Sequence, residues 1–344
     1  MDIRRIVWAA AASVLVARGG LAAGLAPPRE WEIPQLVAQA GDEASGAGAE
    51  KKQSEGEAAP GGYTPEQIAK MIANPLGYLW LLNIQNTTTW YNGSATQAAN
   101  QDLKAQNTLL LQPVLSMQFT PGVRLITRPI VPINSFELPS NFNSLTNSTQ
   151  PSSGQVTFER TTGLCDITWQ NFFSTNEGVK PPTILGAGFA LVMPTASSEV
   201  LGTGKWSAGP SAVALHMGDK WIYGVVATHI WSFAGDPDRN SINLTSLQPI
   251  IRYAVGKESH IGMLPNWNYN WETHQWAQLP LGLGFDTMLK IGPAPVQFGM
   301  EVYYNVKQYD PISPQWFLRF WFTPVIPAPA WAGKPLFGRL SRHR

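Results

Sequence analysis

The chain has 344 residues, of which 44% are hydrophobic and only 14% are charged, and its formal net charge is +1. A soluble domain carries roughly a quarter charged residues, and no apolar run here is long enough for a membrane-spanning helix. There is also no basic stripe, so nucleic acid is not expected as a partner. The 14 tryptophans are typical of a surface that meets lipid headgroups, although an unusually aromatic soluble β-sandwich remains an alternative.

The first 23 residues have the pattern of a signal peptide. Arg4 and Arg5 precede an apolar stretch at 6–17, and small residues suitable for cleavage follow near Ala23. Residues 24–62 are rich in Ala, Gly, Glu and Pro and cannot bury much apolar surface, so they predict a disordered periplasmic leader. We therefore expect the protein to leave the cytoplasm.

A short helix is predicted within residues 63–78. Thr64 and Gln67 have the spacing of a capping box, with Pro65 at the first helical position. Pro75 marks the end of the helix, because the residue before a proline disfavours helical geometry. The helix either closes the mouth of the fold or rests at its edge, or it is a simple spacer.

Residues 79–324 predict a transmembrane β-barrel. From 278 to 285, leucines and Phe285 alternate with polar or small residues, which gives one strand an oily face and a polar face. Similar segments recur, and their number, about 12, is even, as single-chain bacterial barrels require. The expected class is thus an all-β, antiparallel, up-and-down barrel. The predicted strands are 79–88, 109–120, 123–133, 166–173, 183–193, 206–216, 221–233, 245–255, 259–269, 276–289, 296–304 and 316–323.

The polar parity of these strands predicts the residues that face the interior. The polar side chains could line a pore of mixed charge, or they could form paired networks that merely fill the barrel. Our pore-lining candidates are Arg124, Arg128, Asp166, Gln170, Gln248, Arg252, Asn266, Asn268, Gln278, Asp286, Gln297, Glu301 and Arg319.

Aromatic residues near strand ends predict the two girdles of a membrane barrel. In the strand 221–233, the first and last aromatic pairs share one parity. Ten residues at ~3.3 Å each, tilted by about 45°, span roughly 23 Å, which is close to the apolar band of such barrels. The girdle candidates are Trp221, Tyr223, Trp231, Phe233 and Trp316.

An ordered set of motifs in the middle of the chain resembles a known family. The set runs from Leu201-Gly202-Thr203-Gly204-Lys205-Trp206 through Gly209-Pro210-Ser211 and His229-Ile230-Trp231-Ser232-Phe233 to Leu247-Gln248-Pro249. It is similar to the bacterial outer-membrane barrels related to the MetA-pathway phenol-degradation proteins, often labelled neuromedin-U-like. The resemblance covers roughly residues 72–322. It implies an outer-membrane barrel that transports small organic or aromatic compounds, and it supplies no catalytic residues.

The chain departs from that pattern at its C-terminal end. Such barrels commonly end on an aromatic residue that the assembly machinery reads, whereas here the last predicted strand is followed by a Pro- and Arg-containing tail at 325–344. The leader at 24–62 is also long for the group. These departures affect recognition by the assembly machinery rather than the prediction of a barrel.

The residues do not predict catalysis, a cofactor or a metal site. His229 and Ser232 invite a hydrolase interpretation, but in a strand they have opposite parity and point to opposite faces. The other histidines lack metal-ligand spacing, and a single cysteine, Cys165, excludes an intrachain disulfide.

The function predicted from the sequence is passive transport of small solutes, including hydrophobic or aromatic ones, across the bacterial outer membrane. The expected partners are outer-membrane lipid, the solutes and the barrel-assembly machinery. One alternative is a non-transport barrel with a structural role or a loop-binding role centred on residues 134–162. A second alternative, with little support, is an outer-membrane lipid-modifying enzyme.

Overall fold

A computed structural model of the chain describes residues 79–92, 105–139, 158–175, 183–291, 294–307, 313–326 and 328–337. The predicted signal peptide, leader and short helix lie outside these residues, as does most of the 134–162 connection. Within the described ranges, no helix has the length and apolarity needed to cross a membrane.

The described structure consists of strands and one short 3-10 helix. The elements are β1 (Trp80–Asn92), β2 (Gln106–Thr120), β3 (Val123–Pro139), β4 (Phe158–Leu164), β5 (Ile167–Thr175), β6 (Thr183–Met193), β7 (Lys205–Met217), β8 (Trp221–Gly235), β9 (Asn243–Ala254), β10 (Ser259–Met263), β11 (Trp267–Asn270), β12 (Gln275–Gln278), β13 (Pro280–Ile291), β14 (Ala294–Asn305), β15 (Ser313–Ile326) and η1 (Ala330–Gly333).

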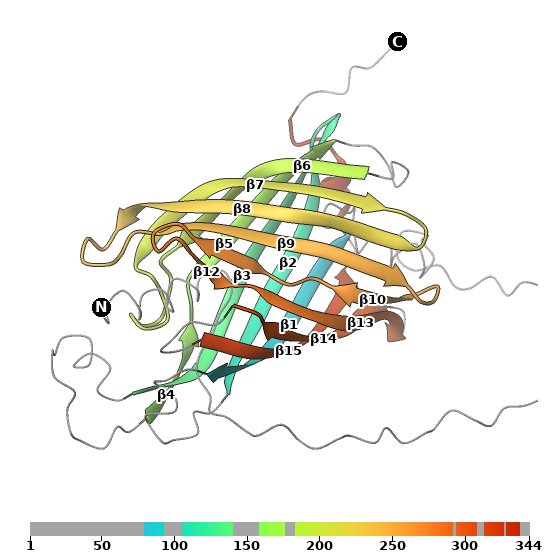
Figure 1. The fold of residues 1–344 in the computed structure, drawn as a ribbon. Coiled ribbons are helices and arrows are strands. Elements are labelled where there is room, and N and C mark those ends of the chain that lie inside the picture. Colours follow the sequence, from blue (N-terminus) through green and yellow to red (C-terminus); the bar gives the residue numbers. More distant parts are fainter. Residues whose placement is uncertain are drawn as a thin grey trace, which may run out of the picture.

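The strands form one closed antiparallel sheet. Each strand pairs with its neighbours in chain order, β1 pairs with β15, and the pairing of β9 with β10 completes the ring. Three of the twelve barrel strands are each built from two segments: β4 with β5, β10 with β11, and β12 with β13. Figure 1 shows β6–β9 crossing the opposite wall at a steep angle. The predicted all-β up-and-down barrel of 12 strands is confirmed.

The two ends of the barrel differ in their connections. One end, which we call the tight-turn end, carries the turn at Pro121-Gly122 and the turn at 218–220. The opposite end, the loop end, carries longer connections such as 194–204 and 236–242. Because the first and last strands also begin and finish at the tight-turn end, both termini of the barrel lie there. In outer-membrane barrels, the short turns are periplasmic.

The outer wall is apolar because the alternate strand residues with hydrophobic side chains face outward. On β13, Leu281, Leu283 and Phe285 are exposed, whereas Asp286, on the other face, is buried. The five expected girdle residues are all exposed, between 45% and 60%. Trp221 and Tyr223 lie at the tight-turn end of β8, and Trp231 and Phe233 lie near its loop end. The exterior is thus an apolar band with aromatic rings towards both rims.

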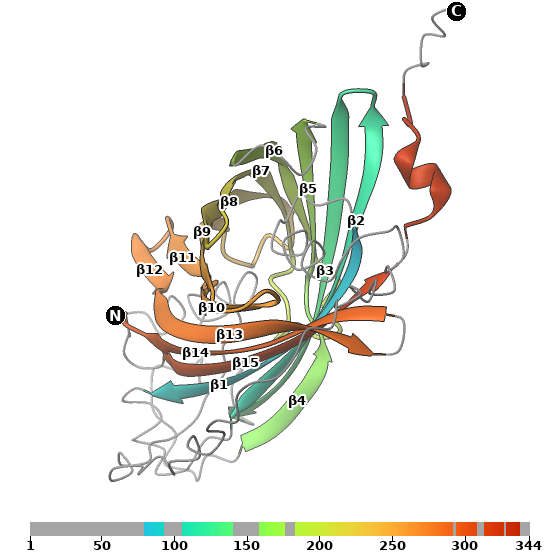
Figure 2. The ribbon, with the colours of Figure 1, turned by 90° about the vertical axis from the view of Figure 1, so that its right-hand side faces the viewer.

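The segment after the last strand folds back onto the outer wall. The η1 ring of Trp331 packs edge-on against Trp80, with the ring centroids 5.7 Å apart. Phe337 contacts Phe119 in the same manner at 5.1 Å, and its backbone N–H donates to the carbonyl of Phe119. Figure 2 shows η1 outside the sheet, beside β2. The segment therefore covers the tight-turn end of β1 and β2.

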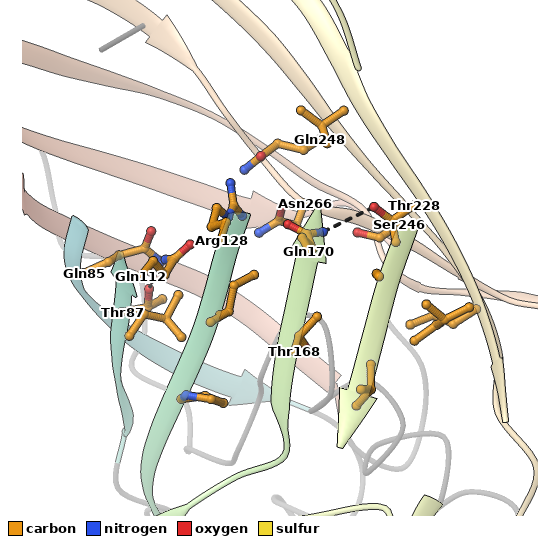
Figure 3. Close-up of a pocket in the computed structure, with 18 of the residues that line it drawn as sticks. Gln85, Thr87, Gln112, Arg128, Thr168, Gln170, Thr228, Ser246, Gln248 and Asn266 are labelled. Carbon is orange, nitrogen blue, oxygen red and sulfur yellow. Dashed lines mark hydrogen bonds between the residues drawn. The ribbon is translucent and has the colours of Figure 1, made fainter. Parts of the chain in front are cut away.

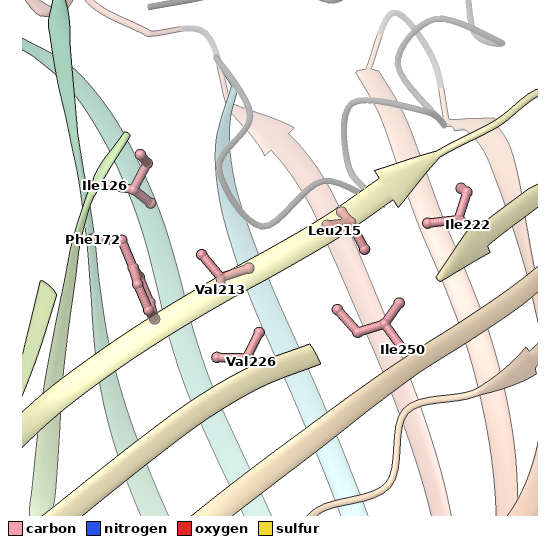
Figure 4. Close-up of a cluster of buried hydrophobic side chains, with 7 residues drawn as sticks. All are labelled: Ile126, Phe172, Val213, Leu215, Ile222, Val226 and Ile250. Carbon is pink, nitrogen blue, oxygen red and sulfur yellow. The ribbon is translucent and has the colours of Figure 1, made fainter. Parts of the chain in front are cut away.

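The interior towards the tight-turn end is filled by apolar side chains on one wall. Figure 4 shows the cluster, whose members come from β3, β5, β7, β8 and β9. They are Ile126, Phe172, Val213, Leu215, Ile222, Val226 and Ile250. This apolar cluster narrows the barrel at the end where the turns are short.

Candidate functional site

An ionic network occupies the interior wall formed by β9, β10 and β13–β15, and it adjoins the apolar cluster at β9. The Asp286 carboxylate on β13 pairs with Arg252 of β9, lies 3.3 Å from Nδ1 of His260, and accepts a hydrogen bond of 2.8 Å from Gln297. Glu301 of β14 joins the same network, because Arg252 lies 3.7 Å from its carboxylate. Four strand segments of the barrel, β9, β10, β13 and β14, thus meet in one charged cluster.

Glu301 also links the network to a break in the barrel wall. Arg319 of β15 donates to Glu301 at 3.0 Å and to the carbonyl of Leu264 at 2.9 Å. Leu264 lies between β10 and β11, where the ladder is interrupted, and its N–H donates to the Tyr303 hydroxyl at 2.8 Å. These side chains satisfy backbone groups that a continuous ladder would otherwise satisfy, as a membrane barrel requires.

A polar cavity of about 110 Å³ lies inside the barrel, on the loop-end side of the apolar cluster. Figure 3 shows side chains from several strands converging on it. Its polar lining is dominated by amides and hydroxyls, with two arginines and no carboxylate. These polar residues are Gln85, Thr87, Gln112, Arg128, Thr168, Gln170, Thr228, Ser246, Gln248, Asn266, Gln278 and Arg319.

Some of the amides are held by short chains of hydrogen bonds along the wall. Gln170 donates to the Thr228 hydroxyl at 3.3 Å, and that hydroxyl lies 3.0 Å from the hydroxyl of Ser211. On the other side, Gln112 donates to Asn83. Oε1 of Gln170 and Oε1 of Gln278 have no hydrogen-bond partner among the described residues. The cavity therefore contains amide oxygens whose capacity to accept hydrogen bonds is unused.

The 13 predicted pore-lining residues divide into groups. Six of them line the cavity: Arg128, Gln170, Gln248, Asn266, Gln278 and Arg319. Arg252, Asp286, Gln297 and Glu301 belong to the ionic network. Arg124 lies towards the tight-turn end, where it donates to Ser116 and Gln118, and Asn268 is fully buried.

Asp166 does not face the cavity, which corrects its expected position. Its carboxylate accepts hydrogen bonds of 2.7 Å from both the N–H and the hydroxyl of Thr203, and one of 3.2 Å from the N–H of Ala196. It anchors the 194–204 loop at the loop end. Gly202 allows this approach because a Cβ there would overlap the carboxylate, and Gly204 takes a positive φ of 67° at the end of the loop.

The cavity also has lining residues that the prediction did not select. Thr168 and Ser246 share the parity of Gln170 and Gln248 on their strands, so parity could have found them. A lone hydroxyl in a strand is a weak polar signal, however, because threonine and serine occur on either face. His260 was missed as a network member, because no spacing rule links β10 to Asp286.

The residue pair that suggested a hydrolase does not come together. His229 lies 2.8 Å from the Thr245 hydroxyl and beside the Trp231 ring, on the outward parity of β8. The Ser232 hydroxyl instead accepts from the N–H of Ile242. Within the part of the chain that the structure describes, no group of three metal-binding side chains occurs.

Comparisons with known proteins found similarity only among solved structures. No protein-family model and no curated protein matches the chain, so the predicted relation to the MetA-pathway group stays a prediction. An outer membrane channel from Pseudomonas putida F1 is 18% identical, with a TM-score of 0.46 over 72% of this chain and 94% of that one.

Two further solved structures are more distant. Outer membrane phospholipase A from Escherichia coli is 13% identical, with a TM-score of 0.38 over 75% of this chain and 98% of that one. The toluene transporter TodX from Pseudomonas putida is 9% identical, with a TM-score of 0.34 over 75% and 92%. At such distances, function has to be argued from the chain's own residues.

Proposed function

We propose that this protein is a barrel of the bacterial outer membrane that lets small solutes cross. In this proposal the chain is exported by its N-terminal signal, is inserted by the barrel-assembly machinery and is surrounded by outer-membrane lipid. The relation to aromatic-compound transporters that the sequence motifs imply is part of the same proposal.

The observation that carries the proposal is a polar cavity inside a closed barrel whose outer wall is apolar. Exposed leucines and aromatic rings on the outside are unfavourable in water and favourable in lipid. Amides and hydroxyls inside a lipid-embedded barrel are expensive to bury unless they meet water or a polar solute. The two faces together therefore favour a transport role over a purely apolar scaffold.

The small volume left between the interior side chains favours slow, selective passage over an open pore. A water needs about 10–15 Å³ of such space, so the cavity of about 110 Å³ suits roughly seven to ten waters or one small organic molecule. Towards the tight-turn end, the apolar cluster and the ionic network together line the interior and adjoin at β9. A solute must displace side chains there, and side-chain motion would set its rate.

A second candidate is a barrel without transport, and the ionic network favours it. Arg252, Asp286, Glu301 and Arg319 neutralise one another, as expected for a filled interior that only braces the wall. The two candidates differ in what happens when the cavity is filled, which the following experiment measures.

The test compares two tryptophan substitutions at adjacent positions of β9. Ser246 lines the cavity, whereas Leu247 lies on the outward parity. We expect Ser246→Trp to reduce solute flux into proteoliposomes at least tenfold and Leu247→Trp to leave it unchanged.

Single-channel recording of the refolded protein, with and without residues 24–72, tests whether the leader restricts passage.

The result also separates the two candidates. A folded, heat-modifiable wild-type barrel that passes neither ions nor small solutes would overturn the transport proposal and favour the bracing role. Equal flux through both tryptophan variants would show that solutes do not use the cavity.

A further inference from the structure

Arg128 is an interior arginine that the described residues leave with neither an ion pair nor a hydrogen bond. It lies on β3 with its guanidinium directed into the cavity, facing Gln248 and Asn266 in Figure 3. No ion pair or hydrogen bond joins it to any described residue, and its Nε is buried without a partner. The cavity lining contains no carboxylate.

The other interior arginines are all accommodated. Arg252 pairs with Asp286, and Arg319 pairs with Glu301, while Arg124 donates to Ser116 and Gln118. Burying a charge is costly unless it is paired and hydrogen-bonded. The barrel thus pairs two arginines with carboxylates and hydrogen-bonds a third, Arg124, whereas Arg128 has neither kind of partner among the described residues. A ligand in the cavity could supply both.

We propose that Arg128 binds the carboxylate of a small organic acid, which makes this class of compound the preferred solute; this inference rests on the transport function proposed above. A guanidinium matches a carboxylate through two parallel hydrogen bonds. The neighbouring amides can donate further hydrogen bonds to the same group. The apolar part of the lining, which includes Ile130, Val226 and Phe317, would contact the hydrocarbon body.

The size of the cavity sets the size of the acid. A volume of about 110 Å³ fits a single ring or a short chain with one carboxylate, and it excludes long acyl chains. Benzoate is therefore a suitable probe. Benzamide has the same shape without the charge, and inorganic phosphate has charge without an apolar body.

The first measurement is binding of benzoate and benzamide to the purified full-length barrel in detergent. Hydrogen bonds to a charged group contribute about 1.5–3 kcal/mol, or roughly ten- to a hundredfold in affinity. We expect wild-type protein to bind benzoate at least tenfold more tightly than benzamide, and Arg128→Gln to remove that preference. Equal binding of the two compounds to wild-type protein would overturn the inference without any variant.

Matched variants separate the role of Arg128 from total charge. Arg128→Lys keeps the charge but loses the paired geometry, so it should retain only part of the preference. Lys220→Gln removes one positive charge from the exposed turn between β7 and β8 and should keep all of it. A loss of preference in Lys220→Gln equal to that in Arg128→Gln would overturn the assignment to Arg128.

Flux measurements distinguish this inference from the transport proposal. If proteoliposomes pass benzoate and benzamide equally well in wild-type and Arg128→Gln forms, transport stands and carboxylate selection fails. If the barrel binds benzoate through Arg128 but passes neither compound, transport fails and the binding site stands. Competition by phosphate as strong as that by benzoate would overturn the assignment to organic acids.

Discussion

At the scale of single residues, the interior depends on a few acidic side chains that each serve several partners. Asp286 is only 1% exposed and contacts Arg252, His260 and Gln297. Glu301 holds Arg252 and Arg319 in the same way. Because two acids face two arginines, the loss of one acid leaves an uncompensated positive charge inside the barrel.

We expect Asp286→Asn to destabilise the barrel by about 3–5 kcal/mol, the usual effect of removing one partner from a buried ion pair. The double variant Arg252→Met with Asp286→Leu should lose less, since no lone charge remains. Equilibrium unfolding in lipid vesicles, followed by tryptophan fluorescence, measures both. A double variant less stable than Asp286→Asn would contradict this account.

We expect substitution of Asp166 to affect the stability of the 194–204 loop and not that of the whole barrel. Asp166→Asn weakens the charge-assisted hydrogen bonds to Thr203 and Ala196, and the loss of one such bond costs about 1.5–3 kcal/mol. Amide hydrogen exchange in the 194–204 loop should accelerate by the corresponding factor. Exchange in the middle of β13 serves as the control and should stay unchanged; acceleration there as well would argue against a purely local anchor.

At the scale of elements, the segment from η1 to Phe337 acts as a clasp on the outer wall. Two aromatic pairs with Trp80 and Phe119 hold it in place, together with backbone hydrogen bonds from Leu336 and Phe337 to the carbonyls of Gln118 and Phe119. We expect it to stabilise the tight-turn end, where the first strand begins and the last strand finishes.

Removing either ring should weaken the clasp without unfolding the barrel. Trp331→Ala and Phe337→Ala should each lose about 0.5–1.5 kcal/mol beyond the effect of burial. The temperature at which the folded band shifts on gel electrophoresis should fall for both. Lys334→Ala, an exposed position in the same segment, is the matched control, and a fall of the same size there would contradict the role of the rings.

At the scale of the whole molecule, the exposed apolar band defines how the barrel sits in a bilayer. Leu283 lies near the middle of the wall, opposite Val302 on β14, and Trp221 lies at a rim. Leu283→Arg should therefore cost about 2–4 kcal/mol, and Trp221→Arg about 0–1 kcal/mol. Unfolding titrations in vesicles measure both losses of stability. Equal losses for the two variants would show that Leu283 is not nearer the middle of the apolar band than Trp221.

Much of this architecture could be predicted from sequence because period-two patterning is local. Each predicted strand has its counterpart in the barrel, and the parity of β8 placed Trp221 and Trp231 on the outside. Parity could not separate Asp166, which anchors a loop, from Arg128, which faces the cavity. That difference depends on contacts between segments that are distant in sequence. The same is true of the contact between His260 and Asp286, and of the hydrogen bonds that Arg319 and Tyr303 form with Leu264.

The ring closure of β1 with β15 has a consequence for biogenesis. Trp90 pairs with Trp316, so the first strand meets its last partner only when nearly the whole chain has been made. Until then the growing sheet has two unpaired edges, and such edges promote aggregation. Contacts so distant in sequence also form slowly. We therefore expect aggregation of the unfinished chain to be limited only if both edges are shielded until the seam closes.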